Sequence, residues 1–131
     1  MFIAGKAATC LAGVLFSLAW THSVEKTQWV EHWRVVESNN APTLSLDLTK
    51  VKGSGAGIDP APHAQWVDGW YQWQPATPLA VPQLILANSE LTTDNWKLCS
   101  LEEKTLQTKL CIDFSSFKPL QAKQFSIIPK P

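Results

Sequence analysis

Two side chains suited to acid–base chemistry lie among tryptophans near the start of the chain. On extended strands, where side chains alternate between two faces, His22 falls on an apolar face and Glu31 falls between Trp29 and Trp33. An imidazole or a carboxylate in such a stripe is costly unless it is paired or hydrogen-bonded. If the two runs pair across the polar turn at 25–27, His22 and Glu31 lie close enough to fix the imidazole tautomer and shift both pKa values.

Three interpretations of this segment stay open. The pair is a satisfied internal contact that fixes strand register, or a ligand-binding or proton-handling pair, or part of a metal site for which two ligands are an incomplete set. The candidate ligand-binding residues in this segment are His22, Ser23, Glu25, Lys26 and Glu31.

A second unusual segment is the glycine-laced loop that begins at Gly53. Its alternate glycines allow positive φ and close backbone approach, so the N–H groups of Gly55, Ala56 and Gly57 are candidates for holding an anion. The pattern is not the GxGxxG of a nucleotide site, because prolines follow it and no βαβ unit surrounds it. The alternative is an ordinary tight or flexible turn.

Composition and motifs exclude several classes of function. The 131 residues carry 11 basic and 11 acidic side chains, so no net positive charge favours binding to a nucleic-acid backbone. The chain has no GxSxG elbow, HExxH or Walker lysine, and no Cys/His spacing typical of zinc. We therefore expect no nucleic-acid partner, cofactor, metal or catalytic residue.

The elements that position these residues are predicted to be β-strands. Alternation with a period of two runs through most of the chain, turn signals recur at roughly 8–12 residues, and no window shows a helical period. Asp68-Gly69 suits a tight hairpin turn, and 38–42 is a turn cluster. The fold class is therefore all-β, a single antiparallel β-sandwich or partly open barrel of short strands. The predicted strands lie near 16–24, 29–36, 44–49, 84–87, 96–99, 106–114 and 125–129.

The first 15 residues allow two interpretations. They are a leader, with Lys6 before an apolar stretch and Ser17-Leu18-Ala19 as a cleavage site, or the first β-hairpin of the domain. The hairpin is favoured, because cleavage at Ala19 would cut a predicted strand. The single β domain then extends over 16–131.

Cys99 and Cys111 lie in two short strand-like runs that are predicted to be antiparallel neighbours. Such neighbours bring Cα atoms within bridging distance, so a disulfide is expected, with two free thiols as the alternative. Disulfides persist in oxidising compartments, which favours a location outside the cytoplasm.

Seven tryptophans are many for a chain of this length. Each buries a large ring and has one N–H that needs a partner. They fill a small core, or some of them line a groove for a ligand or a protein partner.

Together, the His-Ser-Val-Glu motif at 22–25, the Gly-Ala-Gly motif at 55–57, DGWYQW at 68–73 and the WKLC…C spacing give the chain a family resemblance. From about Phe16 to Cys111 it resembles small uncharacterised bacterial proteins encoded beside TAXI-type TRAP transporters, which take up solutes with a binding protein. The resemblance implies a domain in or facing the periplasm, near the membrane, with a TRAP membrane subunit or solute receptor as partner.

Three hypotheses about function follow. The first is a non-enzymatic accessory or binding protein of such an uptake system. The second is a small enzyme with Glu25 or Glu31 as base and His22 as its partner. The third is a purely structural envelope domain.

Overall fold

A computed structural model describes residues 2–4, 8–21, 27–52, 61–87, 96–113 and 124–129. The described residues form β-strands joined by turns and irregular segments, with no helix among them, so the predicted all-β class is confirmed. In chain order the strands are β1 (Phe2–Ala4), β2 (Ala8–Cys10), β3 (Leu15–Thr21), β4 (Gln28–Ser38), β5 (Ala41–Lys52), β6 (Gln65–Val67), β7 (Trp70–Trp73), β8 (Ala80–Val81), β9 (Leu84–Ala87), β10 (Lys97–Leu101), β11 (Thr108–Asp113) and β12 (Gln124–Ile128).

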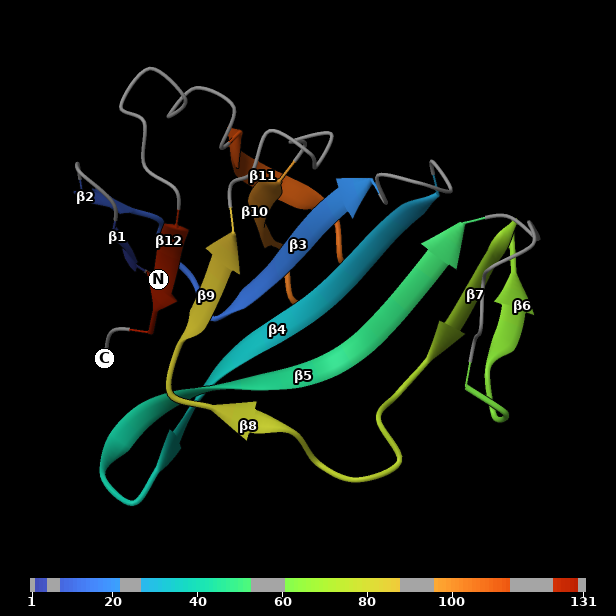
Figure 1. Cartoon of the computed structure of the whole chain (residues 1–131), viewed down its shortest axis with the longest axis horizontal. Coiled ribbons are helices and arrows are strands. Elements are labelled where there is room, and N and C mark those ends of the chain that lie inside the picture. Colours follow the sequence, from blue (N-terminus) through green and yellow to red (C-terminus); the bar gives the residue numbers. More distant parts are fainter. Residues whose placement is uncertain are drawn as a thin grey trace.

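The larger of two sheets holds most of the chain. Its eight strands follow the order β11-β10-β3-β4-β5-β7-β6, and β8 pairs with β5 beside this path. All of these pairings are antiparallel, and most join strands that are neighbours in sequence. Figure 1 shows β3, β4 and β5 crossing the middle of the molecule, with the β6–β7 hairpin at one end of the sheet.

The β4–β5 hairpin is the longest element of the fold. Its strands have 11 and 12 residues and extend beyond the predicted runs 29–36 and 44–49. Asn39 and Asn40 have φ of 54° and 64°, the left-handed conformation that suits a two-residue hairpin turn. The predicted turn at 38–42 is therefore narrower than expected, because Ala41 and Pro42 already pair with β4.

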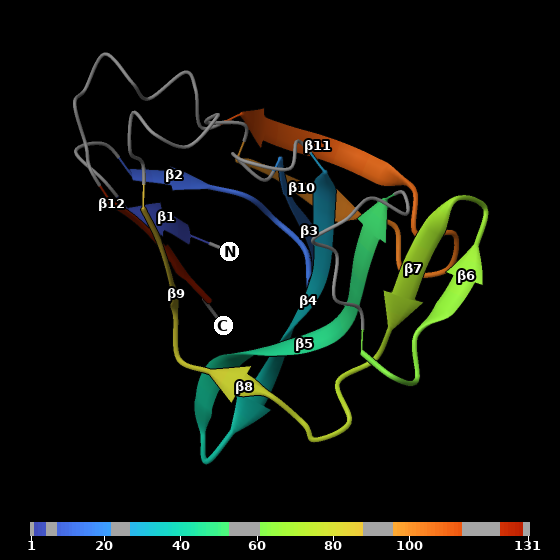
Figure 2. The ribbon, with the colours of Figure 1, turned by 45° about the vertical axis from the view of Figure 1, so that its right-hand side comes forward.

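The smaller sheet faces the larger one. Its four strands follow the order β2-β1-β12-β9, all antiparallel. Figure 2 shows this sheet on one side and β3–β5 on the other, with β8 leading into β9 at the base. This arrangement is a partly open barrel, as predicted. The division between a leader and the domain near residue 15 stays a prediction.

The core lies between the two sheets. Phe16 and Leu18 of β3, Trp33 of β4, Leu44 of β5 and Leu98 of β10 form one buried cluster. Ile127 of β12 and Leu11, which follows β2, join the same cluster from the other side. Phe16 and Leu18 share a strand face because of the two-residue period, and burying that face positions β3 and β4 for the site described below.

The predicted cysteine pair closes the β10–β11 hairpin. Cys99 and Cys111 lie directly opposite each other, and their sulfur atoms are 2.07 Å apart, the distance of a disulfide. Cys99 is buried and Cys111 is exposed. The pair is compatible with an extracytoplasmic protein. Of the described residues, none lies in a helix long and apolar enough to cross a membrane.

Candidate functional site

The inner face of β3 and β4 holds the predicted stripe of rings around a carboxyl group. Trp20 lies opposite Trp29, and Leu18 lies opposite Glu31. The predicted antiparallel pairing of these two runs is therefore confirmed. Strand alternation then requires Trp29 and Glu31 to point to the same face, towards the core.

Three indole rings gather at one end of this face. Trp20 stacks on Trp29 with centroids 6.0 Å apart and planes inclined by 12°. Trp96, just before β10, tilts against Trp20 at 5.0 Å. We call Trp20, Trp29 and Trp96 the indole cluster. β10 pairs with β3, and this pairing carries Trp96 to its place although it lies far along the chain.

Glu31 is half-buried beside the indole cluster. Its strand neighbours are Leu18 on β3 and Thr49 on β5, and neither brings a positive charge. Burial raises the pKa of the Glu31 carboxyl, whereas a hydrogen bond donated by Trp33 Nε1 to Glu31 Oε1, 3.1 Å long, opposes the rise. The group is thus poised to take up a proton at a higher pH than an ordinary glutamate.

Two buried polar atoms at the same end have no hydrogen-bond partner in the described part of the chain. They are Trp29 Nε1 and Thr27 Oγ1. Buried polar groups are nearly always paired, and an unpaired one costs about 1–3 kcal/mol. The indole N–H can only donate, whereas the hydroxyl can donate or accept. A ligand with both kinds of group would satisfy them.

Most of the predicted site residues lie outside the described residues. These are His22, Ser23, Glu25 and Lys26, between β3 and β4, and Gly55, Ala56 and Gly57, after β5. Glu31 is described, and the fold places it among indole rings. The proposed pairing of His22 with Glu31 therefore stays a prediction. The predicted site residues did not include Thr27, which precedes Trp29 by two positions, or Thr49, which becomes a neighbour of Glu31 only through strand register.

A different histidine is buried on the opposite face of β4. His32 lies opposite Ser17 on β3 and Leu48 on β5. Burial lowers the pKa of His32, the charge of Lys50 lowers it further, and Asp47 opposes both. His32 is 9% exposed, with a neighbour from β3 on one side and from β5 on the other.

Glu31→Gln should make the protein more stable than wild type at neutral pH. The folded-state pKa of Glu31 is raised, so its protonated form contributes stability that is fully present below about pH 4.3, the unfolded value. Wild type loses that contribution as the pH rises through the folded pKa, and the uncharged amide does not. The difference in free energy of unfolding, measured by urea titration from pH 3 to 8, should grow with pH and then level off. A constant difference over this range would contradict the raised pKa.

Comparison with known proteins gives a family but no described relative. Neither the curated proteins nor the solved structures include a match to this chain. The sequence profile of a domain of unknown function, DUF1850, matches residues 16–106. This range starts in β3, ends in the turn of the β10–β11 hairpin, and includes the indole cluster and Glu31. It lies within the range from about Phe16 to Cys111 over which the sequence shows the family resemblance. The chain therefore belongs to the DUF1850 family, an uncharacterised family of domains of unknown function.

Proposed function

We propose that this protein is a non-enzymatic binding protein that takes a ligand, or a segment of a partner, at Glu31 and the indole cluster. The observation that carries the proposal is the half-buried carboxyl with its raised pKa beside two buried polar atoms, Trp29 Nε1 and Thr27 Oγ1, for which the described residues provide no hydrogen-bond partner. A few convergent polar groups among aromatic rings are typical of binding sites. The ligand would offer an acceptor to the indole N–H and an apolar surface to the rings.

The contacts of Glu31 favour binding over acid–base catalysis. Its hydrogen-bond partner, Trp33 Nε1, is a donor that does not exchange protons at ordinary pH. Leu18 and Thr49, its strand neighbours, do not titrate in that range either. General acid–base catalysis needs a proton donor or acceptor aligned with the substrate, and usually a second group that restores its protonation state. Trp33, Leu18 and Thr49 provide no such second group.

The setting we propose is the periplasm, or the periplasmic side of the membrane, with the protein as an accessory of a TAXI-type TRAP uptake system. The Cys99–Cys111 disulfide supports a location in an oxidising compartment. The motifs at 22–25 and 55–57 support the transporter association by resemblance alone. The partner would be the membrane subunit or the solute receptor.

Uptake and co-purification test this function together. In a strain lacking the gene, wild-type protein should restore solute uptake and co-purify with a TRAP subunit from the envelope. Glu31→Gln and Trp29→Phe should weaken both, because the first removes the carboxylate and the second removes the indole N–H. Glu37→Gln is the matched control, since Glu37 is exposed near the end of the same strand. It should behave as wild type.

Two outcomes would overturn the proposal. If deletion leaves uptake unchanged and no transporter subunit co-purifies, the association with the TRAP system is wrong. If Glu31→Gln raises stability but restores uptake as well as Glu37→Gln does, Glu31 has a structural role only.

A further inference from the structure

Two lysines on the outer face of the larger sheet converge on one tryptophan. Lys50 and Lys52 lie two residues apart on β5 and so share a face, and Trp70 of β7 lies opposite Lys52. The Lys50 Nζ atom is 4.7 Å from the centroid of the Trp70 ring, and the Lys52 Nζ atom is 5.6 Å from it. Both distances fit cation–π contacts.

No carboxylate neutralises these two ammonium groups within the described ranges. The ion pairs found there engage Arg34 with Asp47 and Glu103, and Lys109 with Glu102. The positive charge of Lys50 also acts on His32 on the same face, because it helps to lower the pKa of that imidazole. Two like charges held over one ring attract an anion, and the contact with Trp70 fixes their direction.

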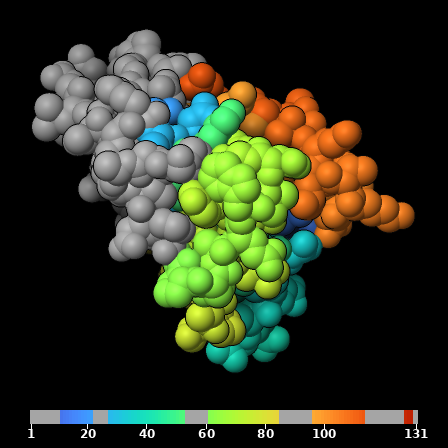
Figure 3. Space-filling view, turned by 90° about the vertical axis from the view of Figure 1, so that its right-hand side faces the viewer, coloured from blue at the N-terminus to red at the C-terminus, as the bar shows by residue number. Residues whose placement is uncertain are grey.

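A pocket of about 290 Å³ adjoins the lysines. It is lined by Leu48, His63, Gln65, Gln72, Trp73 and Gln74. Leu48 precedes Lys50 by two residues on the same face of β5, and Gln72 lies directly opposite Lys50. The β6–β7 hairpin supplies Gln65, Gln72 and Trp73 to the pocket lining. This hairpin forms the centre of the side of the molecule shown in Figure 3.

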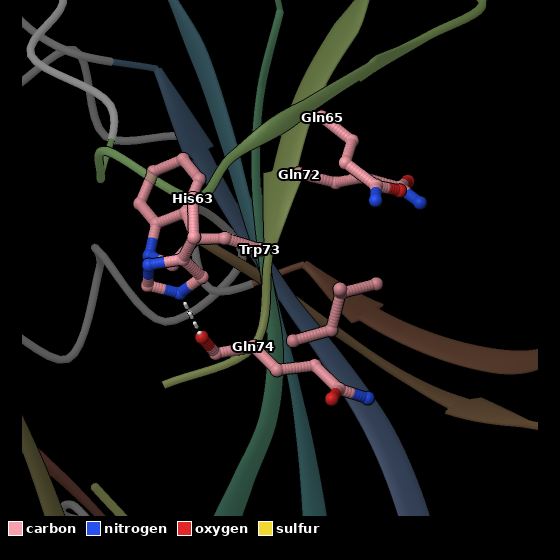
Figure 4. A pocket seen from close by; sticks show the side chains of 6 residues that line it. His63, Gln65, Gln72, Trp73 and Gln74 are labelled. Atoms are coloured by element: carbon pink, nitrogen blue, oxygen red, sulfur yellow. Dashed lines mark hydrogen bonds between the residues drawn. The ribbon is translucent and has the colours of Figure 1, made fainter. Parts of the chain in front are cut away.

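Three of the six residues that line the pocket are glutamines, whose side-chain amides are uncharged. Figure 4 shows the side-chain amides of Gln65 and Gln72 together on one side of β7, with His63 and Trp73 on the other. His63 Nε2 lies 2.6 Å from the carbonyl oxygen of Gln74, a hydrogen bond that ties the segment before β6 to the end of β7. Each glutamine amide offers two donors and an acceptor, which suits hydroxyl groups.

We propose that Lys50, Lys52, Gln72 and Gln65 form a binding site for a hydroxylated organic anion of the sugar-acid class. The two ammonium groups would take the carboxylate, and the amides would take the hydroxyls of the ring. The pocket is at the lower end of the usual range for small-molecule sites, which fits one monosaccharide unit. Lys50, Lys52, Gln65 and Gln72 lie on the opposite face of the sheet from Glu31 and its neighbour Thr49, so this proposal does not depend on the proposed function.

Nuclear magnetic resonance titration of the full chain with D-glucuronate tests the site. Glucuronate should shift the side-chain amide signals of Gln65 and Gln72, whereas methyl glucoside, which has the ring without the carboxylate, should not. Lys50→Gln with Lys52→Gln should weaken glucuronate binding by about tenfold or more, because a hydrogen bond to a charged group is strong. Gln65→Ala should weaken it less. Lys104→Gln with Lys109→Gln removes the same charge from the β10–β11 hairpin and should leave it unchanged.

Two results would overturn the proposal. The first is the absence of shifts at the glutamine amides in the presence of glucuronate. The second is equal binding to the two double variants, because net charge alone would then explain the affinity. Titration with a short uronate oligomer distinguishes a free sugar acid from a polysaccharide as the ligand. Tighter binding of the oligomer through the same lysines identifies a polysaccharide ligand, and equal binding identifies a free sugar acid.

Discussion

Trp33→Ala is expected to lower the free energy of unfolding by about 3–5 kcal/mol, the usual loss when a buried tryptophan is cut back to alanine. Trp33 is 4% exposed and belongs to the core cluster with Phe16 and Leu44. The substitution also leaves the half-buried Glu31 carboxyl without its indole donor. Domains of this size are typically stable by about 5–15 kcal/mol, so the loss is a large part of the total. Urea unfolding measured by circular dichroism gives the value.

Trp33→Phe separates the two contributions. Phenylalanine keeps most of the ring and removes the N–H that Glu31 accepts. The stability loss should be smaller than for alanine, and the pKa of Glu31 should rise above its wild-type value, because the hydrogen bond lowers it. A carbon-13 titration of the Glu31 carboxyl measures that change. An unchanged pKa in Trp33→Phe, or a loss below about 1 kcal/mol in Trp33→Ala, would show that Trp33 does not hold the site as described.

Replacing both Cys99 and Cys111 by alanine should destabilise the protein by about 3 kcal/mol. The bridge joins residues separated by 12 positions, and closing a loop of this size restricts the unfolded chain by about that amount. The midpoint of thermal unfolding should fall by about 10 °C. Differential scanning calorimetry measures both quantities.

Reduction of the wild-type protein is the control for the cysteine variant. It breaks the bridge and keeps both side chains, and Cys111 is exposed to the reductant. Reduced wild type should lose nearly the same stability as the double variant. If reduction has no effect while the variant is destabilised, the loss comes from the cavity at buried Cys99 and not from the bridge.

The two faces of the larger sheet differ in chemistry. The inner face holds Glu31 among indole rings, and the outer face holds Lys50 and Lys52 over Trp70 beside an amide-lined pocket. Strand alternation separates the two sets, because neighbouring residues on one strand point to opposite faces. Each face can therefore be tested by its own variants without disturbing the other.

Local features of the fold were predictable from the sequence. The period of two in β3 and β4 and the polar turn between them predicted the hairpin that places Glu31 among tryptophans. Asp68 and Gly69 have positive φ at the predicted turn between β6 and β7. Cys99 and Cys111 pair as expected, since two short strands joined by a polar turn have few other registers. These features depend on residues close together in the chain, where side-chain period and turn geometry determine the structure.

Contacts between distant segments were decided only by the tertiary structure. Trp96 joins Trp20 because β10 adds to the free edge of β3, and no local pattern specifies that edge. His32 is buried between Ser17 of β3 and Leu48 of β5, neighbours that it gains only through strand pairing. The lysine pair meets Trp70 only through the register of β5 with β7. The sequence by itself determined which residues share a strand face. The order and register of the strands determined which faces meet, because strand order and register depend on burying the core as a whole.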